Sequence, residues 1–282
     1  MRNFLFVPGN SPKMLSAADH LGGDAIVIDL EDAVAQTEKD AARRLTRGAM
    51  AALRYKTPVG VRINALDTPH WQADLTAVLP LRPAFILLPK AGRAGEVRQL
   101  AAAMDGLEPS GASVGIFALL ETAEGIEHAY EIAGASPRVR ALMLGAEDLT
   151  ADLCAVRTKQ GTEILYSRGR VVCAAHAAGV DAYDTPFTDL EDLEGLAADA
   201  RLARQLGFTG KAAINPRHIE TINEAFSPSE SERAWADEVL AAAEAAAREG
   251  RGAVSLHGKM IDPPIIARAR YIAALAKEGA QA

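Results

Sequence analysis

The sequence is poor in cysteine. Its 282 residues include two cysteines, Cys154 and Cys173, and these do not form a Cys-x-x-Cys pair. So few thiols cannot build a disulfide framework, and they argue against a zinc or iron–sulfur centre. We therefore expect a reducing compartment.

Long apolar runs and long runs of one charge are also missing. The N-terminal run Phe4–Val7 ends at Pro8-Gly9, too early for a signal peptide, and no stretch approaches the ~20 apolar residues that span a bilayer. The formal net charge of -7 is spread along the chain. Without a basic patch we expect neither nucleic acid nor a membrane surface as a partner, and we predict a cytoplasmic protein.

Short apolar segments rich in Val and Ile recur along the chain, and Ala/Leu-rich stretches of helical character separate them. Eight segments are predicted as strands: Asn3–Val7, Ala25–Leu30, Val59–Ile63, Phe85–Leu88, Val114–Leu120, Ala141–Leu144, Val180–Tyr183 and Lys211–Ile214. Buried strands that alternate with helices are typical of parallel sheets, and eight close a barrel of about 250 residues. We predict an α/β fold, a (β/α)8 TIM barrel over residues 1–216. An open doubly wound sheet is the alternative, disfavoured because no G-x-G-x-x-G turn follows the first strand.

Residues 217–282 form a predicted C-terminal helical extension. A long helix is expected over Ser229–Arg248, a short segment over Gly252–Leu256 and a last helix over Pro264–Lys277. Ser229 with Glu232 three residues later is typical of a capped helix start. The extension either packs over the barrel, contacts another subunit or acts as a lid.

Polar side chains follow nearly every predicted strand, at the end where barrel enzymes carry their chemistry. Several carboxylates on one rim are costly to bury unless a cation or a substrate balances them. Carboxylates without histidine or thiolate partners favour Mg²⁺, or Mn²⁺ in its place. The spacing does not say which ones bind, and Asp32 could instead pair with Lys39 or Arg43. The rim residues are Asn10, Asp29, Glu31, Asp32, Arg62, Asn64, Lys90, Glu121, Glu147, Asp148, Asp184 and Asn215.

Over essentially its full length the sequence resembles the citrate lyase β-subunit-like proteins, which include malyl-CoA and citramalyl-CoA lyases. The matching motifs are Leu5–Gly9, Asp29–Val34 with Lys39 and Arg43, Val61–Asn64, Leu88–Lys90, Leu120–Gly125, Leu144–Leu149 and Gly210–Pro216. Asn215 departs from the pattern, since many relatives have histidine before the proline. This departure leaves the placement of coenzyme A after the eighth strand open.

The resemblance implies roles for these positions. Glu121 and Asp148 would ligate magnesium, and Arg62 would bind the carboxylate of the keto acid and the developing oxyanion. Three further carboxylates, Asp29, Glu31 and Asp32, would hold metal-bound waters, with Lys39 and Arg43 orienting them. Asn10 and Lys13 would lie near the phosphates of coenzyme A.

The segment Gly258–Asp262 resembles one through which thioester-cleaving relatives supply an acid/base aspartate to a neighbouring subunit. By this resemblance Asp262 is a catalytic candidate, and the family favours homotrimers or hexamers. Asp262 could equally cap the helix that begins at Pro263-Pro264.

Together these features predict a carbon–carbon lyase that cleaves or forms a 3-hydroxyacyl-CoA, such as malyl-CoA or citramalyl-CoA, with an acyl-CoA and a 2-keto acid as products. A Schiff base on Lys90 would be redundant beside a metal. Two alternatives stay open: a citrate lyase β-subunit that acts on an acyl carrier protein within a complex, and a non-catalytic barrel that binds a metal or ligand.

Overall fold

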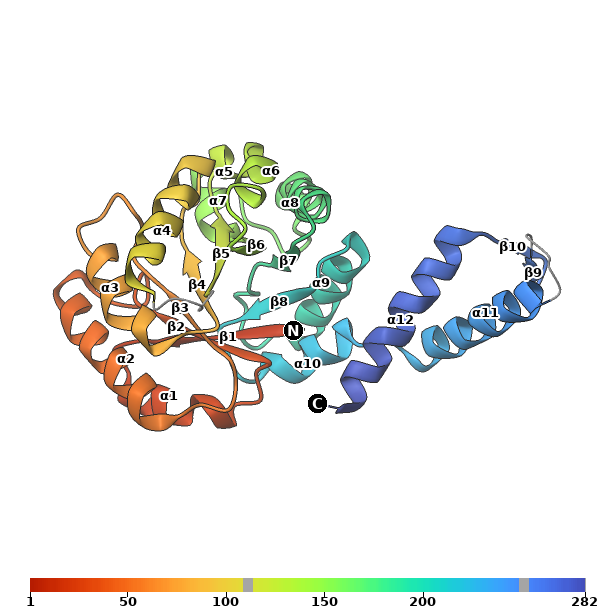
Figure 1. Ribbon diagram of the computed structural model, residues 1–282, viewed down its shortest axis with the longest axis horizontal. Helices are drawn as coiled ribbons and strands as arrows, with labels where there is room; N and C mark the ends of the chain where they lie inside the picture. The colour runs from red at the N-terminus through yellow and green to blue at the C-terminus, as the bar shows by residue number, and fades with distance from the viewer. Residues whose placement is uncertain (109–113, 249–253, 282) are drawn as a thin grey trace. The chain divides into compact units, whose positions relative to one another are not determined.

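A computed structural model describes residues 1–108, 114–248 and 254–281. Eight parallel strands form a closed barrel in sequence order, and β1 pairs with β8 to complete it (Figure 1). The predicted (β/α)8 barrel with a C-terminal helical extension is confirmed. The strands are β1 (Asn3–Pro8), β2 (Ala25–Asp29), β3 (Val59–Arg62), β4 (Phe85–Leu88), β5 (Gly115–Leu120), β6 (Val139–Leu144), β7 (Asp181–Asp184) and β8 (Gly210–Ala213).

Helices follow the strands and surround the barrel (Figure 1). They are α1 (Pro12–Ala17), α2 (Lys39–Leu53), α3 (Trp71–Val78), α4 (Ala94–Leu107), α5 (Ala123–Glu127), α6 (Ala129–Ala133), α7 (Ala146–Asp152), α8 (Leu165–Ala178), α9 (Leu193–Leu206) and α10 (His218–Phe226). Short 3-10 helices span Ala18–His20, Gln36–Glu38, Leu79–Leu81 and Thr162–Ile164.

Aromatic side chains fill the interior of the barrel. Phe85 and Phe117 stack at 3.9 Å between ring centroids, and Phe4 meets Tyr183 edge to face at 4.3 Å. A Cβ atom at Gly60 would lie 2.2 Å from the Phe85 ring, so only glycine fits beside it. The barrel is thus a packed core, and any ligand must bind at its ends.

Two strands differ from the prediction. β6 begins at Val139, earlier than predicted, because the exposed Arg140 interrupts the apolar run without ending the strand. β7 extends to Asp184, whose fully buried charge the apolar pattern did not anticipate.

The chain divides into two compact units, residues 1–223 and 224–282. The sequence-based boundary after Pro216 lies within the first unit, before α10. The second unit contains α11 (Glu230–Arg248), an antiparallel pair of β9 (Val254–Leu256) and β10 (Lys259–Ile261), and α12 (Pro263–Gln281). Of the predicted segment Gly252–Leu256, the first two residues lie outside the described ones.

A small hydrophobic core holds the second unit together. Val239 of α11 packs with Ile261, Ala269 and Ile272. Asp262 precedes α12, and its Oδ1 accepts the Ile265 amide at 3.1 Å, so this aspartate caps the helix. No helix within the described residues is long and apolar enough to cross a membrane.

Candidate functional site

A pocket opens at the carboxyl ends of the barrel strands. It lies where the polar rim was predicted, because the carboxyl ends of all eight parallel strands meet on one face. Glu121 and Asp148, the two predicted metal ligands, both line it, and so does Arg62. The lining residues are Phe6, Asp32, Arg62, Leu119, Glu121, Met143–Asp148, Thr185, Pro186 and Ile214.

Glu121 follows β5 directly and is almost completely buried. Its Oε1 accepts the backbone N–H of Lys90 at 2.8 Å. A Cβ atom at Gly145 would lie 2.7 Å from both Cβ and Oε2 of Glu121, so this carboxylate rests against bare backbone. Burial raises the pKa of Glu121 to about 8, against the opposing effect of the Lys90 amide. Such a carboxyl group requires a cation to remain ionised at neutral pH.

Asp148 lies in the first turn of α7, and nearby hydrogen bonds fix the start of this helix. The Gly145 amide donates to the Leu120 carbonyl at 3.0 Å, and the Ala146 amide donates to Thr185 Oγ1 at 3.0 Å. Asp148 is half-buried, and its negative charge acts on Glu121. The two carboxylates therefore face the same space from neighbouring strand ends.

Arg62, at the end of β3, is enclosed by carboxylates. Its Nε and Nη2 donate to the two oxygens of Asp29 at 2.7 and 2.6 Å. Nη1 lies 3.0 Å from Glu31 and 3.3 Å from Asp32. Burial alone would lower the pKa of Arg62, but the hydrogen bonds and charge of Asp29 hold it above its ordinary value. Asp32 thus pairs with Arg62, and the alternative pairing with Lys39 or Arg43 is not observed.

Side-chain hydrogen bonds to backbone carbonyls stabilise the segment that carries Asp29, Glu31 and Asp32. The buried Nζ of Lys39 donates to the carbonyls of Leu30 at 2.9 Å and Glu31 at 2.6 Å. Asn64 Nδ2 donates to the same Leu30 carbonyl at 3.0 Å. Lys39 therefore supports the backbone of this segment rather than its side chains.

Arg43 acts on this segment indirectly. Its Nε donates to Asp74 Oδ1 at 2.7 Å, and Asp74 Oδ2 in turn accepts Asn64 Nδ2 at 2.6 Å. Sequence reasoning did not single out Asp74, because a carboxylate within α3 carries no motif. Asn64 and Lys90 follow strands and were noted on the rim, but no role was given to them.

The predicted coenzyme A contacts are peripheral. Asn10 donates from Nδ2 to Glu38 Oε2 at 2.6 Å, and the side chain of Lys13 is exposed on α1. Neither residue lines the pocket described above.

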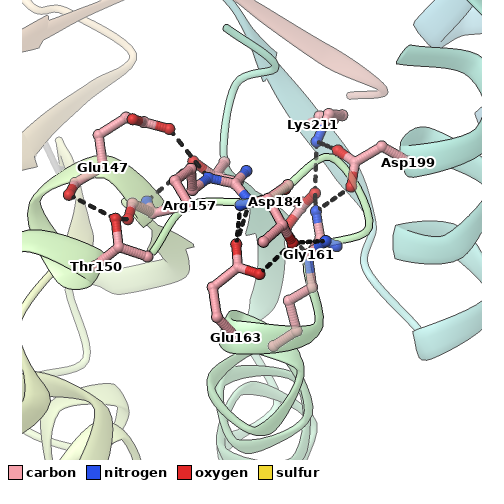
Figure 2. A network of polar contacts seen from close by, with 12 residues as sticks. Glu147, Thr150, Arg157, Gly161, Glu163, Asp184, Asp199 and Lys211 are labelled. Atoms are coloured by element: carbon pink, nitrogen blue, oxygen red, sulfur yellow. Dashed lines mark hydrogen bonds and ion pairs between the residues drawn. The ribbon is translucent and has the colours of Figure 1, made fainter. Parts of the chain in front are cut away.

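Asp184 was predicted on the rim, but its side chain is locked inside the protein. It accepts Arg168 at 2.9 Å and Lys211 at 2.6 Å, and both cations also contact Asp199 at 2.6 Å (Figure 2). The side chains of Arg168, Asp184 and Lys211 are fully buried and that of Asp199 nearly so. We call these four residues the buried quartet; its two cations balance its two carboxylates.

A second chain of ion pairs lies beside the pocket. Arg157 contacts Glu147, a lining residue, at 3.1 Å and Glu163 at 2.6 Å (Figure 2). Thr150 fixes the backbone at the same place, since its Oγ1 donates to the Glu147 carbonyl at 3.0 Å. Glu147 is therefore paired with a cation, whereas Asp148 beside it forms no ion pair with any of the residues that the structure describes.

The residues around the pocket fit a divalent cation. Five carboxylates, Asp29, Glu31, Asp32, Glu121 and Asp148, interact with three cations, Lys39, Arg62 and Lys90, which leaves a formal charge of -2. Burial raises the pKa of Glu31 to about 7, although Arg62 opposes the shift. No group of three or more His, Cys, Asp or Glu within the described residues forms a complete metal cage. Two carboxylates with water and substrate oxygens completing the shell is the usual magnesium arrangement.

Comparison with known proteins gives a consistent result. The family model described as HpcH/HpaI aldolase/citrate lyase matches residues 2–216 of this chain. The chain is 42% identical to citrate lyase subunit beta of Leuconostoc mesenteroides subsp. cremoris, covering 98% of this chain and 93% of the relative. It is 35% identical to the (3S)-malyl-CoA thioesterase of Cereibacter sphaeroides, covering 98% and 94%.

Among solved structures, the chain is similar to the protein CitE of Mycobacterium tuberculosis in complex with magnesium, acetoacetate and coenzyme A. The TM-score is 0.83 and the identity 34%, with 98% of each chain covered. The match to the family description spans most of the chain, and the relatives cover nearly all of it. The protein therefore belongs to the HpcH/HpaI aldolase/citrate lyase family.

Proposed function

We propose that the protein is a magnesium-dependent carbon–carbon lyase of the cytoplasm. It cleaves, or in reverse forms, a 3-hydroxyacyl-CoA such as malyl-CoA or citramalyl-CoA, with an acyl-CoA and a 2-keto acid as products. One observation carries the proposal: Glu121 and Asp148 line a single pocket beside Arg62, in a region with surplus negative charge.

Glu121 and Asp148 would hold the Mg²⁺, with Mn²⁺ as a substitute. When bound, the ion would supply positive charge next to the substrate oxygen on which negative charge develops. Arg62 has five N–H donors, of which Asp29, Glu31 and Asp32 occupy four. The remaining Nη2 N–H is the donor that Arg62 can offer to that oxygen or to the substrate carboxylate.

In the cleavage direction the bond between the carbinol carbon and the α-carbon of the thioester breaks. A base takes the hydroxyl proton, the carbinol becomes the keto group, and the electron pair passes to the α-carbon as a thioester enolate. The base, now protonated and acting as an acid, gives that proton to the α-carbon. We assign this role to Asp262, acting on a neighbouring subunit's site in a homotrimer or hexamer, and we assign Asn10 and Lys13 to the coenzyme A phosphates.

A second candidate is a β-subunit that acts on an acyl carrier protein thioester within a citrate lyase complex. The observation that favours this candidate is sequence identity: the chain is 42% identical to a citrate lyase subunit beta and 35% identical to the (3S)-malyl-CoA thioesterase. A third candidate is a barrel that binds a metal or ligand without catalysis.

The test is a panel of 3-hydroxyacyl-CoA esters incubated with the purified protein, with Mg²⁺ or with EDTA. We expect release of a keto acid that EDTA abolishes. Glu121→Gln should lower turnover by more than about 100-fold, because even groups that only orient a metal ligand change affinity 10–100-fold when removed. Glu124→Gln is the matched control, since Glu124 pairs with the exposed Arg93.

Each other outcome has a distinct meaning. Cleavage that requires an added acyl carrier protein would establish the complex-bound subunit. Ligand binding without cleavage in either assay would favour the non-catalytic barrel. Full metal-dependent turnover in Glu121→Gln would refute the assignment of the site.

A further inference from the structure

Arg62 is largely occupied before any substrate arrives. Its bidentate contact with Asp29 and the contacts of Nη1 leave a single N–H, and its side chain is only 11% exposed. Asp29 alone balances its charge. Arg62 is therefore poorly suited to bind two substrate carboxylates.

Lys90, which follows β4, differs from Arg62 because most of its N–H donors have no partner within the described residues. Its side chain is 44% exposed, and its one side-chain contact within the described residues is with Glu31 Oε1 at 3.3 Å. An ammonium group has three donors, so most of its hydrogen-bonding capacity is unused. The negative charges of Asp32 and Asp148, which line the pocket, also act on it. Lys90 itself does not line the pocket, but Glu31, which it contacts, also contacts the lining residue Arg62 at 3.0 Å, so the ammonium group lies one carboxylate away from the pocket lining.

The backbone of Lys90 is held in an unusual conformation. Its φ is +51°, in the left-handed region that residues with a side chain seldom adopt. Two contacts stabilise it: the Lys90 amide donates to Glu121 at 2.8 Å, and the Ala91 amide donates to the Leu119 carbonyl at 3.0 Å. These contacts fix the backbone from which the Lys90 side chain starts, next to the proposed metal ligand Glu121.

The other cations near the pocket already have partners within the protein. Lys39 is buried and bonded to two backbone carbonyls, and Arg157 is shared between Glu147 and Glu163. The formal charge of -2 around the pocket already includes Lys90, so a divalent ion would bring this group of residues to neutrality. A ligand with one carboxylate could bind through the ion and Arg62. Of the three cations in this group, Lys90 has the most unused donors for a second carboxylate.

We propose that Lys90 binds the second carboxylate of a keto acid that has two, and so selects dicarboxylate over monocarboxylate keto acids. This inference rests on the proposed function, because it assumes that a keto acid binds at Glu121 and Asp148. It also narrows that function, since malyl-CoA and citramalyl-CoA would release keto acids with one carboxylate, whereas a citryl thioester would release one with two. Lys90 acts as a charge with free donors, and its hydrogen bonds with the ligand would add to the existing contact with Glu31.

The experiment compares oxaloacetate, which has two carboxylates, with pyruvate, which has one. Binding of each to the Mg²⁺-saturated full-length protein is measured by titration calorimetry with freshly prepared ligand. The wild-type protein should prefer oxaloacetate by about tenfold or more, the usual effect of one charge-assisted hydrogen bond. Lys90→Met should lose this preference while its pyruvate affinity stays within about twofold. Lys90→Arg should keep most of it.

Lys56→Met is the control, since Lys56 is an exposed lysine that precedes β3, at the end of this strand opposite to Arg62. A separate Mg²⁺ titration of each variant shows whether Lys90 acts through Glu121. The inference is overturned if Lys90→Met keeps the preference, weakens both ligands equally or loses Mg²⁺ affinity, or if the wild type has no preference. A wild type that binds neither keto acid in the presence of Mg²⁺ would instead refute the proposed function itself.

Discussion

The buried quartet provides the sharpest test of how charge stabilises this barrel. Replacing Asp199 with Asn keeps the shape of the side chain but removes one negative charge, so that Asp184 alone faces Arg168 and Lys211. Removing one partner of a buried ion pair costs about 3–5 kcal/mol, because a charge stays buried without compensation. Because Asn can still accept hydrogen bonds, we expect the free energy of unfolding to fall by about 3 kcal/mol, the lower end of that range.

The loss should depend on pH in a definite direction. Burial would raise the pKa of Asp199, but Lys211 and Arg168 outweigh it and hold this pKa below the ordinary value of 3.8. A carboxylate with a lowered pKa in the folded state contributes stability above its unfolded pKa, and this contribution is lost as pH falls through the folded pKa. The wild type and Asp199→Asn should therefore differ fully near neutral pH and converge below about pH 4.

Urea unfolding of both proteins from pH 7 to pH 3 measures this difference. Asp189→Asn is the control: Asp189 pairs with Lys159 at the surface, where removing a charge should cost less than about 1 kcal/mol. Combining Asp199→Asn with Lys211→Met restores charge balance, so the double variant should lose less than the sum of the single losses. A loss below about 1 kcal/mol, or one that does not change with pH, would refute this account of the quartet.

Three further predictions concern the pocket. Gly145→Ala should lower Mg²⁺ affinity about 10–100-fold in a folded protein, because its Cβ would meet the Glu121 Cβ at 2.7 Å; unchanged affinity would contradict the close packing. Arg62→Lys should lower kcat at least about 100-fold while Mg²⁺ still binds, since lysine cannot form the fork with Asp29; steady-state kinetics test this. Asp262→Asn should keep the helix cap and lose turnover, whereas Asp262→Ala should lose turnover and about 1 kcal/mol of stability; wild-type activity in both variants would leave Asp262 with capping alone.

The barrel could be predicted from the sequence because its strands are nearly continuous apolar runs. The pattern failed where charge entered a strand: Arg140 made β6 look shorter, and Asp184 is the last residue of β7 rather than a rim residue. Arg140 is exposed to solvent within the strand, and Asp184 is balanced by Arg168 and Lys211, neither of which a local apolar pattern can show.

The positions of the candidate site residues were also predictable in part. Carboxylates that directly follow strands, such as Glu121, had to meet on one face of a parallel barrel. The groups that hold them were not predictable. Asp74 belongs to a helix, and Thr185 contributes a single hydroxyl that accepts the Ala146 amide, so their importance arises from contacts across the fold.

Charge balance distinguishes the two clusters of ionised residues in this barrel. Asp184 is the last residue of β7, and Asp148 lies in the first turn of α7, just after β6. Asp184 meets two cations in a sealed, neutral quartet, while Asp148 belongs to a group with more carboxylates than cations. A balanced buried cluster needs no ligand, and its removal should affect stability first. An unbalanced cluster that opens to a pocket is costly until something positive binds, which is why we assign the chemistry to Glu121 and Asp148 and not to the more deeply buried quartet.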